Sequence, residues 1–338
     1  MEAMNLYLSD VYEPWFNLAV EDWIFTRMDP SVPTLYLWRN KDTVVIGRYQ
    51  NPWTECRLDD MKKDDVYLAR RQSGGGAVYH DLNNTNFTFL AGVDDYSPEV
   101  GFGLITRALN SFGIEGEVSG RNDLIVTREG EPRKFSGSAF RKLTDRAFHH
   151  GTLLINSDLT RLNNYLTPPK KKLEAKGIKS VRSRVINLAE LNDKINHEDL
   201  CREISGEFQK AFNLPLKTVT INREFMEDKE GFKEIYEKLK SSQWLYGNTP
   251  PFTHKFEERL SLGQFEMLLD VKKGIIQSAL IYTDSLFPDL IRDLQQELTG
   301  KDYRTEDVSA SLNKLTASYP ERKDMLEELG TFLMKEMD

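Results

Sequence analysis

Three consecutive glycines, Gly74-Gly75-Gly76, constrain the fold of this chain more than any other feature, and Arg70 and Arg71 precede them. The runs at 65–69 and 86–90 on either side are typical of β-strands. Glycine has no Cβ, so such a backbone can approach a ligand closely and direct successive N–H groups at it. Arginine is always charged and bonds paired oxygens bidentately. The segment therefore predicts a phosphate- or carboxylate-binding loop at the edge of an antiparallel sheet.

Two common nucleotide-binding loops are excluded. A P-loop needs Gly-x-x-x-x-Gly-Lys-Ser/Thr at the start of a helix, and no Lys-Ser or Lys-Thr follows here. A dinucleotide fingerprint needs Gly-x-Gly-x-x-Gly between a strand and a helix, whereas strand-like sequence follows this run. The alternative is a glycine-rich hairpin turn whose arginines are solvated, and the segments described below favour the ligand-binding interpretation.

The composition is that of a globular protein. The 338 residues are enough for a large core and predict two domains. No apolar run approaches the roughly 20 residues of a membrane span. The first residues lack the basic and apolar regions of a secretory signal, and two cysteines, Cys56 and Cys201, give no disulfide framework or metal cluster. The sequence therefore predicts a cytoplasmic protein, and its net charge of −8 argues against a general nucleic-acid binder.

The charge is unevenly distributed along the chain. From residue 253 to the end there are 11 Lys and Arg against 17 Asp and Glu, which accounts for most of the net charge. This shift coincides with Pro250-Pro251. We therefore expect a large first domain at 1–248 and a smaller accessory domain at 253–338.

Hydrophobic periodicity predicts an α+β fold, with a mainly antiparallel sheet flanked by helices and a small C-terminal α+β domain. In the first domain we expect helices at 14–28, 98–112 and 197–212, and strands at 35–38, 43–47, 123–127, 133–140 and 151–155. The turn at 40–42 joins the first two strands. In the second domain we expect strands at 264–270 and 275–283 and helices at 287–299 and 321–337.

Four further segments carry chemically useful side chains at strand ends and loops, where sites usually form. They are 47–53 with Arg48 and Trp53, 120–123 with Asn122 and Asp123, 134–139 with Lys134, and 149–152 with two histidines. Each has a structural alternative: Arg48 and Lys134 as solvated charges, Trp53 as a core residue, and the histidines as packing. Their occurrence within one predicted domain favours a shared site.

Together these motifs resemble the lipoate–protein ligases. The resemblance rests on Arg70-Arg71-x-Ser73-Gly74-Gly75-Gly76-Ala77-Val78-Tyr79-His80-Asp81, with the segments at 120–123, 133–139 and 149–152, and it extends over essentially the whole chain. It implies the fold of biotin–protein ligases and of the class II aminoacyl-tRNA synthetase core. It also implies two steps: lipoate attacks Mg-ATP to give lipoyl adenylate, and a lysine of a lipoyl domain or glycine-cleavage H protein then displaces AMP.

The resemblance also implies roles for individual residues. Lys134 would be the catalytic residue and contact both substrates. The ATP contacts would be Arg71, Gly76, Ala77, Val78, Tyr79 and Lys134. The lipoate contacts would be Lys134, Ser73, Gly75, His80 and His150, and further candidates are Asn122, Asp123, Ser136 and Gly151. No protein metal site is expected. We expect the apolar lipoate tail to lie near Trp38, Val44, Ala77 and Phe89.

A basic segment at 168–184 holds seven Lys and Arg and one Glu in an otherwise acidic chain. One interpretation is a solvated charged loop. The resemblance implies instead the adenylate-binding loop, with Lys172, Lys179, Arg182 and Arg184 facing AMP or an acidic acceptor.

Two other functions remain open from the sequence. A lipoyl or octanoyl transferase would use a preformed acyl donor and a cysteine nucleophile, for which Cys56 and Cys201 are the candidates. A non-catalytic lipoate sensor or carrier would not need Arg71, the glycine run and Lys134 together. Biotin is disfavoured because the glycine run differs from the usual biotin-ligase pattern, and a monomer is expected.

Overall fold

The computed structural model describes residues 3–120, 122–167, 185–247 and 252–337. The chain divides into two compact units. The first comprises Met1–Ile46, Pro52–Arg71 and Ala77–Leu245, and the second comprises Gly47–Asn51, Gln72–Gly76 and Tyr246–Asp338. Two short loops far from the C-terminus, one of them containing the glycine run, thus group with the C-terminal unit.

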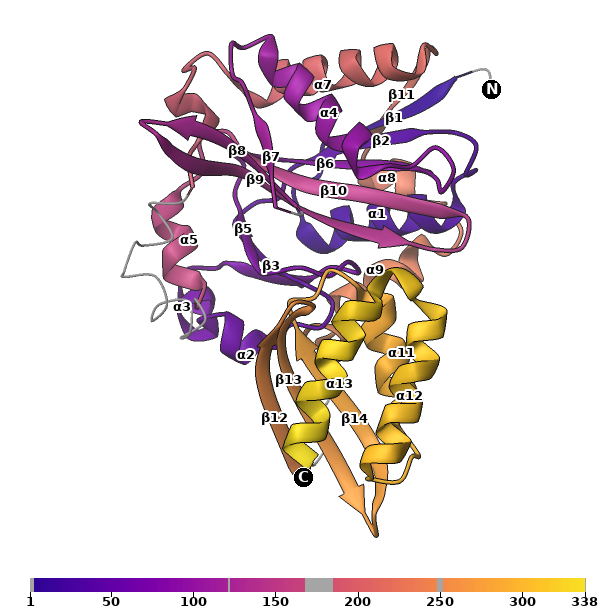
Figure 1. Ribbon diagram of the computed structural model, residues 1–338. Helices are drawn as coiled ribbons and strands as arrows, with labels where there is room; N and C mark the ends of the chain where they lie inside the picture. The colour runs from indigo at the N-terminus through magenta and orange to yellow at the C-terminus, as the bar shows by residue number, and fades with distance from the viewer. Residues whose placement is uncertain (1–2, 121, 168–184, 248–251, 338) are drawn as a thin grey trace. The chain divides into compact units, whose positions relative to one another are not determined.

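The first unit is built on an eight-stranded sheet with the order β11-β1-β2-β6-β10-β9-β8-β7 (Figure 1). β1 pairs in parallel with β2 and β11, and the other pairs in this sheet are antiparallel. The predicted mainly antiparallel α+β fold is confirmed. The strands are β1 (Met4–Ser9), β2 (Thr34–Trp38), β6 (Asn84–Gly92), β7 (Glu117–Ser119), β8 (Asp123–Arg128), β9 (Glu131–Lys142), β10 (Arg146–Leu154) and β11 (Leu216–Ile221).

A second, three-stranded sheet holds the strands around the glycine run. In it β3 (Thr43–Ile46) lies between β4 (Tyr67–Arg70), which is parallel to it, and β5 (Val78–His80), which is antiparallel. The expectation that the glycine run lies at the edge of an antiparallel sheet was therefore wrong. The run connects β4 to β5, and these two strands lie on opposite sides of β3. The predicted strands at 35–38 and 43–47 also belong to different sheets, because β2 pairs with β1 and β6.

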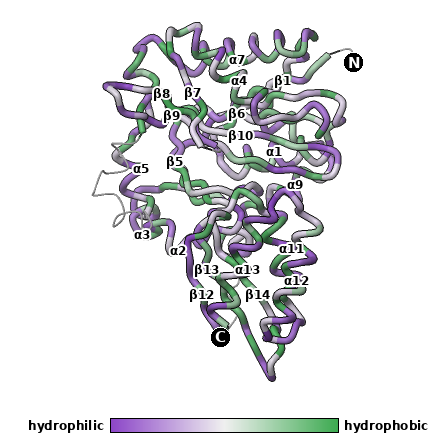
Figure 2. Tube along the Cα trace, viewed as in Figure 1, coloured by the Kyte–Doolittle hydropathy of each residue, from purple (hydrophilic) through white to green (hydrophobic). Residues whose placement is uncertain are grey.

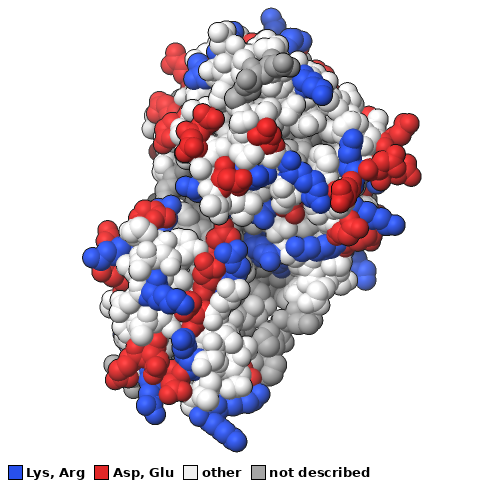
Figure 3. All heavy atoms as spheres, turned by 90° about the vertical axis from the view of Figure 1, so that its right-hand side faces the viewer, with Lys and Arg blue, Asp and Glu red and all other residues white. Residues whose placement is uncertain are grey.

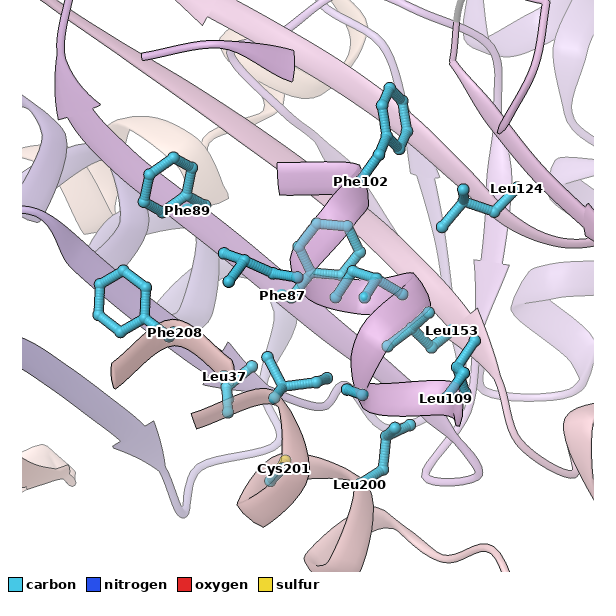
Figure 4. Close-up of a cluster of buried hydrophobic side chains, with 14 of the residues drawn as sticks. Leu37, Phe87, Phe89, Phe102, Leu109, Leu124, Leu153, Leu200, Cys201 and Phe208 are labelled. Atoms are coloured by element: carbon cyan, nitrogen blue, oxygen red, sulfur yellow. The ribbon is translucent and has the colours of Figure 1, made fainter. Parts of the chain in front are cut away.

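Helices α4 (Pro98–Asn110) and α7 (His197–Phe212) cover one face of the large sheet. Phe87 and Phe89 of β6 point toward them, and Phe89 packs edge-on against Phe208 of α7 at 5.8 Å between ring centroids (Figure 4). α7 follows its predicted apolar period, since Leu200, Ile204 and Phe208 are all buried. This helix-facing core is the largest in the first unit.

Helices α1 (Pro14–Arg27) and α9 (Phe232–Lys240) cover the opposite face. Proline near its first turn favours the start of α1 at the predicted residue. The helix is apolar around most of its circumference and is buried accordingly, but two acidic residues, Glu21 and Asp22, are buried with it. Buried carboxylates require partners, so this face of the sheet is where a polar site is expected.

The C-terminal unit has its own core. Three antiparallel strands, β12 (His254–Leu260), β13 (Gly263–Lys272) and β14 (Ile275–Thr283), pack against α11 (Pro288–Leu298), α12 (Thr305–Ser318) and α13 (Lys323–Met337). Hydrophilic and hydrophobic residues alternate along these helices, as expected for one buried face (Figure 2). Lys273 and Gly274, both at positive φ, form the turn between β13 and β14. The sequence did not predict α12.

The remaining helices are short: α2 (Pro52–Glu55), α3 (Leu58–Lys63), α5 (Leu159–Tyr165), the 3₁₀ helix η2 (Leu188–Glu190), α8 (Arg223–Glu227), α10 (Ser242–Tyr246) and the 3₁₀ helix η3 (Pro320–Arg322). On the face drawn in Figure 3, Lys and Arg are interspersed with Asp and Glu. The net charge of −8 therefore forms no single-sign surface on that face.

Candidate functional site

Lys134 lies on β9 and forms an ion pair with Asp123 of β8, with Nζ 2.7 Å from Oδ1. Both side chains are about one-third exposed, which leaves the ammonium group open to a ligand. The backbone of Lys134 is also fixed, because its carbonyl accepts a hydrogen bond from the Ile186 N–H at 2.9 Å. Two residues that the sequence placed in separate motifs are thus direct partners.

The site continues from Lys134 across β9 to β10. Asp123 pairs with Gly137 in the β8–β9 register, and the Gly137 N–H donates to Thr152 Oγ1 at 3.3 Å. Side chains alternate across a strand, so His150 and Thr152 of β10 share one face of the sheet. That face is the one covered by α1, since His150 contacts a residue of that helix.

A buried carboxylate, that of Glu21 on α1, binds two side chains of the large sheet. His150 Nδ1 lies 2.8 Å from Glu21 Oε1, and the Thr88 hydroxyl donates to the same oxygen at 2.6 Å. Glu21 is only 3% exposed. It was not among the site residues predicted from the sequence, although an acidic residue within an otherwise apolar helix was an available signal.

Arg71 and His80 meet in the same region. Arg71 is 6% exposed and donates to the Val45 carbonyl at 3.1 Å. Burial lowers the pKa of Arg71 to about 10, and the negative charge of Glu21 opposes that shift. Burial, together with the charges of Arg71 and His150, lowers the pKa of His80 to about 3, so its ring is neutral at pH 7. Its Nδ1 lies 3.2 Å from Asn40 Nδ2, and it packs edge-on against Trp38.

These contacts form two groups on the α1 side of the sheet. Lys134, about one-third exposed, pairs with Asp123, and a buried polar cluster comprises Glu21, Arg71, His80 and His150. Such an arrangement can place an anionic group at the lysine and a mostly apolar tail inside the protein.

Arg70 donates hydrogen bonds to backbone carbonyls, which the sequence did not predict. Its Nε donates to the Trp244 carbonyl at 2.9 Å, and its Nη2 donates to the Leu245 carbonyl at 2.6 Å. The Trp244 indole donates back to the Arg70 carbonyl at 2.8 Å. Carbonyls at a helix end lack intrahelical partners, so the guanidinium serves as a cap for α10.

The glycines of the run have different roles. A Cβ on Gly74 would lie 2.0 Å from the Ser285 carbonyl oxygen, so close backbone packing requires this glycine. Gly75 has a φ of 88°, and its N–H donates to that same carbonyl at 3.0 Å. A Cβ on Gly76 would have no atom within 4 Å of it. The expectation that the run is free to direct its N–H groups at a ligand is therefore wrong for Gly75 in this structure, while neighbouring Ser73 is fully buried.

Tyr79 is held by its own side-chain contacts. Its hydroxyl donates to Asp42 Oδ1 at 2.9 Å, and the Arg161 guanidinium of α5 lies over its ring. Tyr79 belongs to β5 with Val78, and Ala77 directly precedes that strand. A nucleotide contact by this segment would involve its backbone.

Three of the further candidates lie away from the Lys134 face or are structural. Ser136 pairs with Leu124, whose side chain is in the helix-facing core. A Cβ on Gly151 would lie 2.7 Å from the Phe87 ring, also in that core. Asn122 exchanges hydrogen bonds with the backbone of Ser138. Of the four, only Asp123 reaches Lys134.

One further expectation was wrong, and the structure decides two of the structural alternatives. Phe89 cannot line a slot with Trp38, because Phe89 packs on α7 and Trp38 lies in the core under α1. Trp53 is 52% exposed and is not a core residue. His149 is structural: it is fully buried among Phe87, Phe102 and Phe140, and burial lowers its pKa to about 3.

Lys172, Lys179, Arg182 and Arg184 lie outside the described residues. A cavity of about 530 Å³ lies next to that gap, but neither Lys134 nor His150 lines it. Among the residues that the structure covers, no cluster of three or more His, Cys, Asp and Glu could bind a metal ion. No helix in the described ranges is long and apolar enough to span a membrane.

The chain is similar to known proteins over its whole length. Residues 13–209 match the family described as the lipoyl protein ligase A/B catalytic domain, and residues 249–333 match the bacterial lipoate protein ligase C-terminus. The chain is 48% identical, over the full length of both sequences, to lipoate-protein ligase A of Bdellovibrio bacteriovorus. Among solved structures it resembles P. falciparum LipL1 in complex with lipoate, with 34% identity, a TM-score of 0.86, and coverage of 98% of this chain and 99% of that one.

Two further structures each match part of this chain. A lipoate-protein ligase A bound with ATP matches 73% of this chain and 99% of its own, at 25% identity and a TM-score of 0.61. The bipartite ligase of Thermoplasma acidophilum, described with its E2 lipoyl domain, matches 74% of this chain and 98% of its own, at 26% identity and a TM-score of 0.65.

The fold and the site define an enzyme of the lipoate–protein ligase class. The chain belongs to the lipoyl protein ligase A/B family, and its second match gives it the C-terminal domain of the bacterial ligases.

Proposed function

We propose that this enzyme uses ATP and free lipoate to form lipoyl adenylate, and then transfers the lipoyl group to one lysine of an acceptor protein. In the first step the lipoate carboxylate attacks the α-phosphorus and pyrophosphate leaves. In the second step the acceptor ε-amine attacks the acyl carbonyl and AMP leaves. The acceptors are lipoyl domains of 2-oxoacid dehydrogenases and the glycine-cleavage H protein. The partly exposed Lys134 side chain, paired with Asp123, is the observation that carries this proposal.

Lys134 is the catalytic residue in this proposal. Negative charge grows on the phosphate oxygens in the first step and on the carbonyl oxygen and leaving AMP in the second. A fixed cation beside the acyl–phosphate bond stabilises both transition states. No side chain has to act as a nucleophile, because the substrate carboxylate and the acceptor amine supply that function.

The other site residues hold the two substrates. Arg71 and the segment Gly76, Ala77, Val78 and Tyr79 contact ATP, and Ser73, Gly75, His80 and His150 contact lipoate. Lys172, Lys179, Arg182 and Arg184 face the adenylate. His80, which is neutral at pH 7, and the buried Trp38 offer contacts to the dithiolane tail beside the polar cluster. The catalytic domain spans 1–248 and the accessory domain spans 253–338.

Mg²⁺ enters with the nucleotide in this proposal. The described residues offer no cluster of three metal-binding side chains. Mg²⁺ keeps most of its water and is commonly held by substrate phosphates with one or two carboxylates, so a dedicated protein site is not needed. Asp123 is the carboxylate nearest to Lys134.

The cysteines argue against a transferase that uses a cysteine nucleophile. Burial raises the pKa of both thiols, Cys56 and Cys201, to about 12. A thiolate is the reactive form, so neither cysteine is activated at neutral pH. Cys201 packs in the helix-facing core (Figure 4).

Omission of single substrates separates the ligase from its alternatives. We expect lipoate-dependent exchange of labelled pyrophosphate into ATP, with no exchange when lipoate is left out. We also expect the Cys56→Ser variant to retain this exchange. Acyl transfer from a preformed donor without ATP, abolished by Cys56→Ser, would support the transferase instead.

A further inference from the structure

We propose that Gly137 and Asp123 are positioning residues that fix the Lys134 ammonium group, Gly137 by lacking a side chain and Asp123 by pairing with the charge. The inference rests on the function proposed above, in which Lys134 acts on the acyl phosphate. Its basis is the close contact between Gly137 and the end of the Lys134 side chain.

The end of the Lys134 side chain lies directly against Gly137. A Cβ on Gly137 would be 2.8 Å from Lys134 Nζ and 3.0 Å from its Cε. Gly137 is not among the glycines with positive φ, so its backbone conformation does not require glycine. Glycine is needed at this position because the end of the Lys134 side chain occupies the space that a Cβ would take.

The strands around Gly137 keep this arrangement in register. Asp123 stands opposite Gly137 in the β8–β9 pairing, and a bulge between Leu124 and Ile125 shifts the register beside them. The bulge brings Lys134, three residues before Gly137, onto the same side as Asp123. The Gly137 N–H is bonded to Thr152 of the next strand, so three strands hold the contact.

This geometry limits where the ammonium group can lie. Lysine has a long flexible stem, and its ammonium carries three protons. The ion pair with Asp123, at 2.7 Å, holds the ammonium group on one side, and its protons can bind phosphate and carboxyl oxygens on the other. Because a displacement of about 1 Å at a reacting centre can cost about 100-fold in rate, a lysine moved by one methyl group should lose most of its effect.

Gly137→Ala is the most direct test, with Gly206→Ala as the matched control. The new methyl group closely approaches only the far end of the flexible Lys134 side chain. The variant should therefore fold, and its thermal unfolding midpoint should equal that of the wild type. We expect kcat for lipoate-dependent pyrophosphate exchange to fall about 10- to 100-fold, with KM for lipoate little changed. Gly206 lies on α7 with nothing within 4 Å of the place that its new methyl group would occupy, and its variant should keep the wild-type kcat.

Asp123→Asn tests the second half of the proposal, because it removes the charge and keeps the shape. We expect the same loss of kcat, with partial recovery in Asp123→Glu. A wild-type kcat in Gly137→Ala, or in Asp123→Asn, would overturn the role of that residue. A change only in the Mg²⁺ concentration that Asp123→Asn requires would assign Asp123 to the metal and would also overturn its positioning role.

A second readout does not depend on the reaction. Brief labelling with acetic anhydride, followed by peptide mass spectrometry, reports how free each lysine amine is. We expect Lys134 to react faster in Asp123→Asn and Gly137→Ala than in the wild type, measured against exposed Lys217. Equal rates would overturn the positioning proposal, whereas a wild-type protein without pyrophosphate exchange would overturn the proposed function and leave this measurement valid.

Discussion

At the level of single residues, the site contains one accessible cation, Lys134, and a group of buried polar side chains that interact with one another. Glu21 accepts bonds from Thr88 and His150, and it lies close enough to Arg71 to affect that residue's pKa. A buried charge is tolerated only with such partners, so the cluster is rigid and costly to disturb. Lys134 differs because it keeps one-third of its surface exposed for a substrate.

Lys134→Ala should leave the fold intact and abolish adenylate formation. The side chain is partly exposed, and its loss leaves no uncompensated buried charge, since Asp123 is also about one-third exposed. Circular dichroism and thermal unfolding should therefore match the wild type, while lipoate-dependent pyrophosphate exchange disappears. Near-normal exchange in this variant would remove Lys134 from the mechanism.

Because His149 is buried, we expect the protein to lose stability in acid. Burial lowers its pKa from 6.5 to about 3, so between these values the unfolded chain binds a proton that the folded chain does not. The free energy of unfolding must then fall as the pH falls from about 6.5 toward 3. In His149→Leu, the slope of this free energy against pH should decrease by about 1.4 kcal/mol per pH unit. Urea titrations of the wild type and the variant at pH 6.5, 5.5 and 4.5 measure this slope. An unchanged slope in the variant would show that the pKa of His149 is not lowered by burial.

The sequence was informative for residues whose neighbours are close in the chain and uninformative for distant pairs. Lys134 and Asp123 were singled out because both lie in short motifs on one hairpin. Glu21 was missed because its partner His150 is 129 residues away. Arg70 was misjudged for the same reason, since the carbonyls it binds are at 244 and 245.

Among the helices and strands, periodicity predicted the longer elements and failed for the arrangement of sheets. α1, α4 and α7 start where expected, because a proline or an asparagine cap fixes each start. The small sheet of β3, β4 and β5 was not predicted, because the pairing of a short strand depends on long-range contacts.

Two helical glycines should respond oppositely to alanine. Helix propensity favours alanine by about 1 kcal/mol, so Gly206→Ala on α7 should stabilise the protein by about that amount. On α4, a Cβ at Gly101 would lie 2.2 Å from His149 Nδ1 in the core. Gly101→Ala should therefore destabilise the protein by about 1–3 kcal/mol. Urea unfolding of the two variants tests this, and equal shifts would contradict the packing described for His149.

Within the described residues, the chain has three hydrophobic cores that share no residues, two in the first unit and one in the C-terminal unit. The C-terminal core is built from residues 256–333, with Tyr49 packed against it from an early loop. A core of this kind can support an independently folded domain.

A fragment spanning 246–338 should fold on its own but with reduced stability. It contains the whole C-terminal core and lacks only the segments 47–51 and 72–76 of its unit. We expect a helical circular dichroism spectrum and one cooperative thermal transition. The same fragment with Leu294→Asp, which places a charge in that core, should be unfolded. A featureless spectrum from the unmodified fragment would show that the C-terminal unit depends on the rest of the chain.

ATP-dependent lipoylation of a protein acceptor is the activity on which the other proposals depend, and intact-mass spectrometry of an apo lipoyl domain measures it. The acceptor is incubated with enzyme, lipoate, Mg²⁺ and ATP, and in parallel without ATP. We expect one lipoyl group to be added to the acceptor only when ATP is present, and none to be added by Lys134→Ala. An unmodified acceptor with the wild-type enzyme, or modification that does not require ATP, would refute the proposed function.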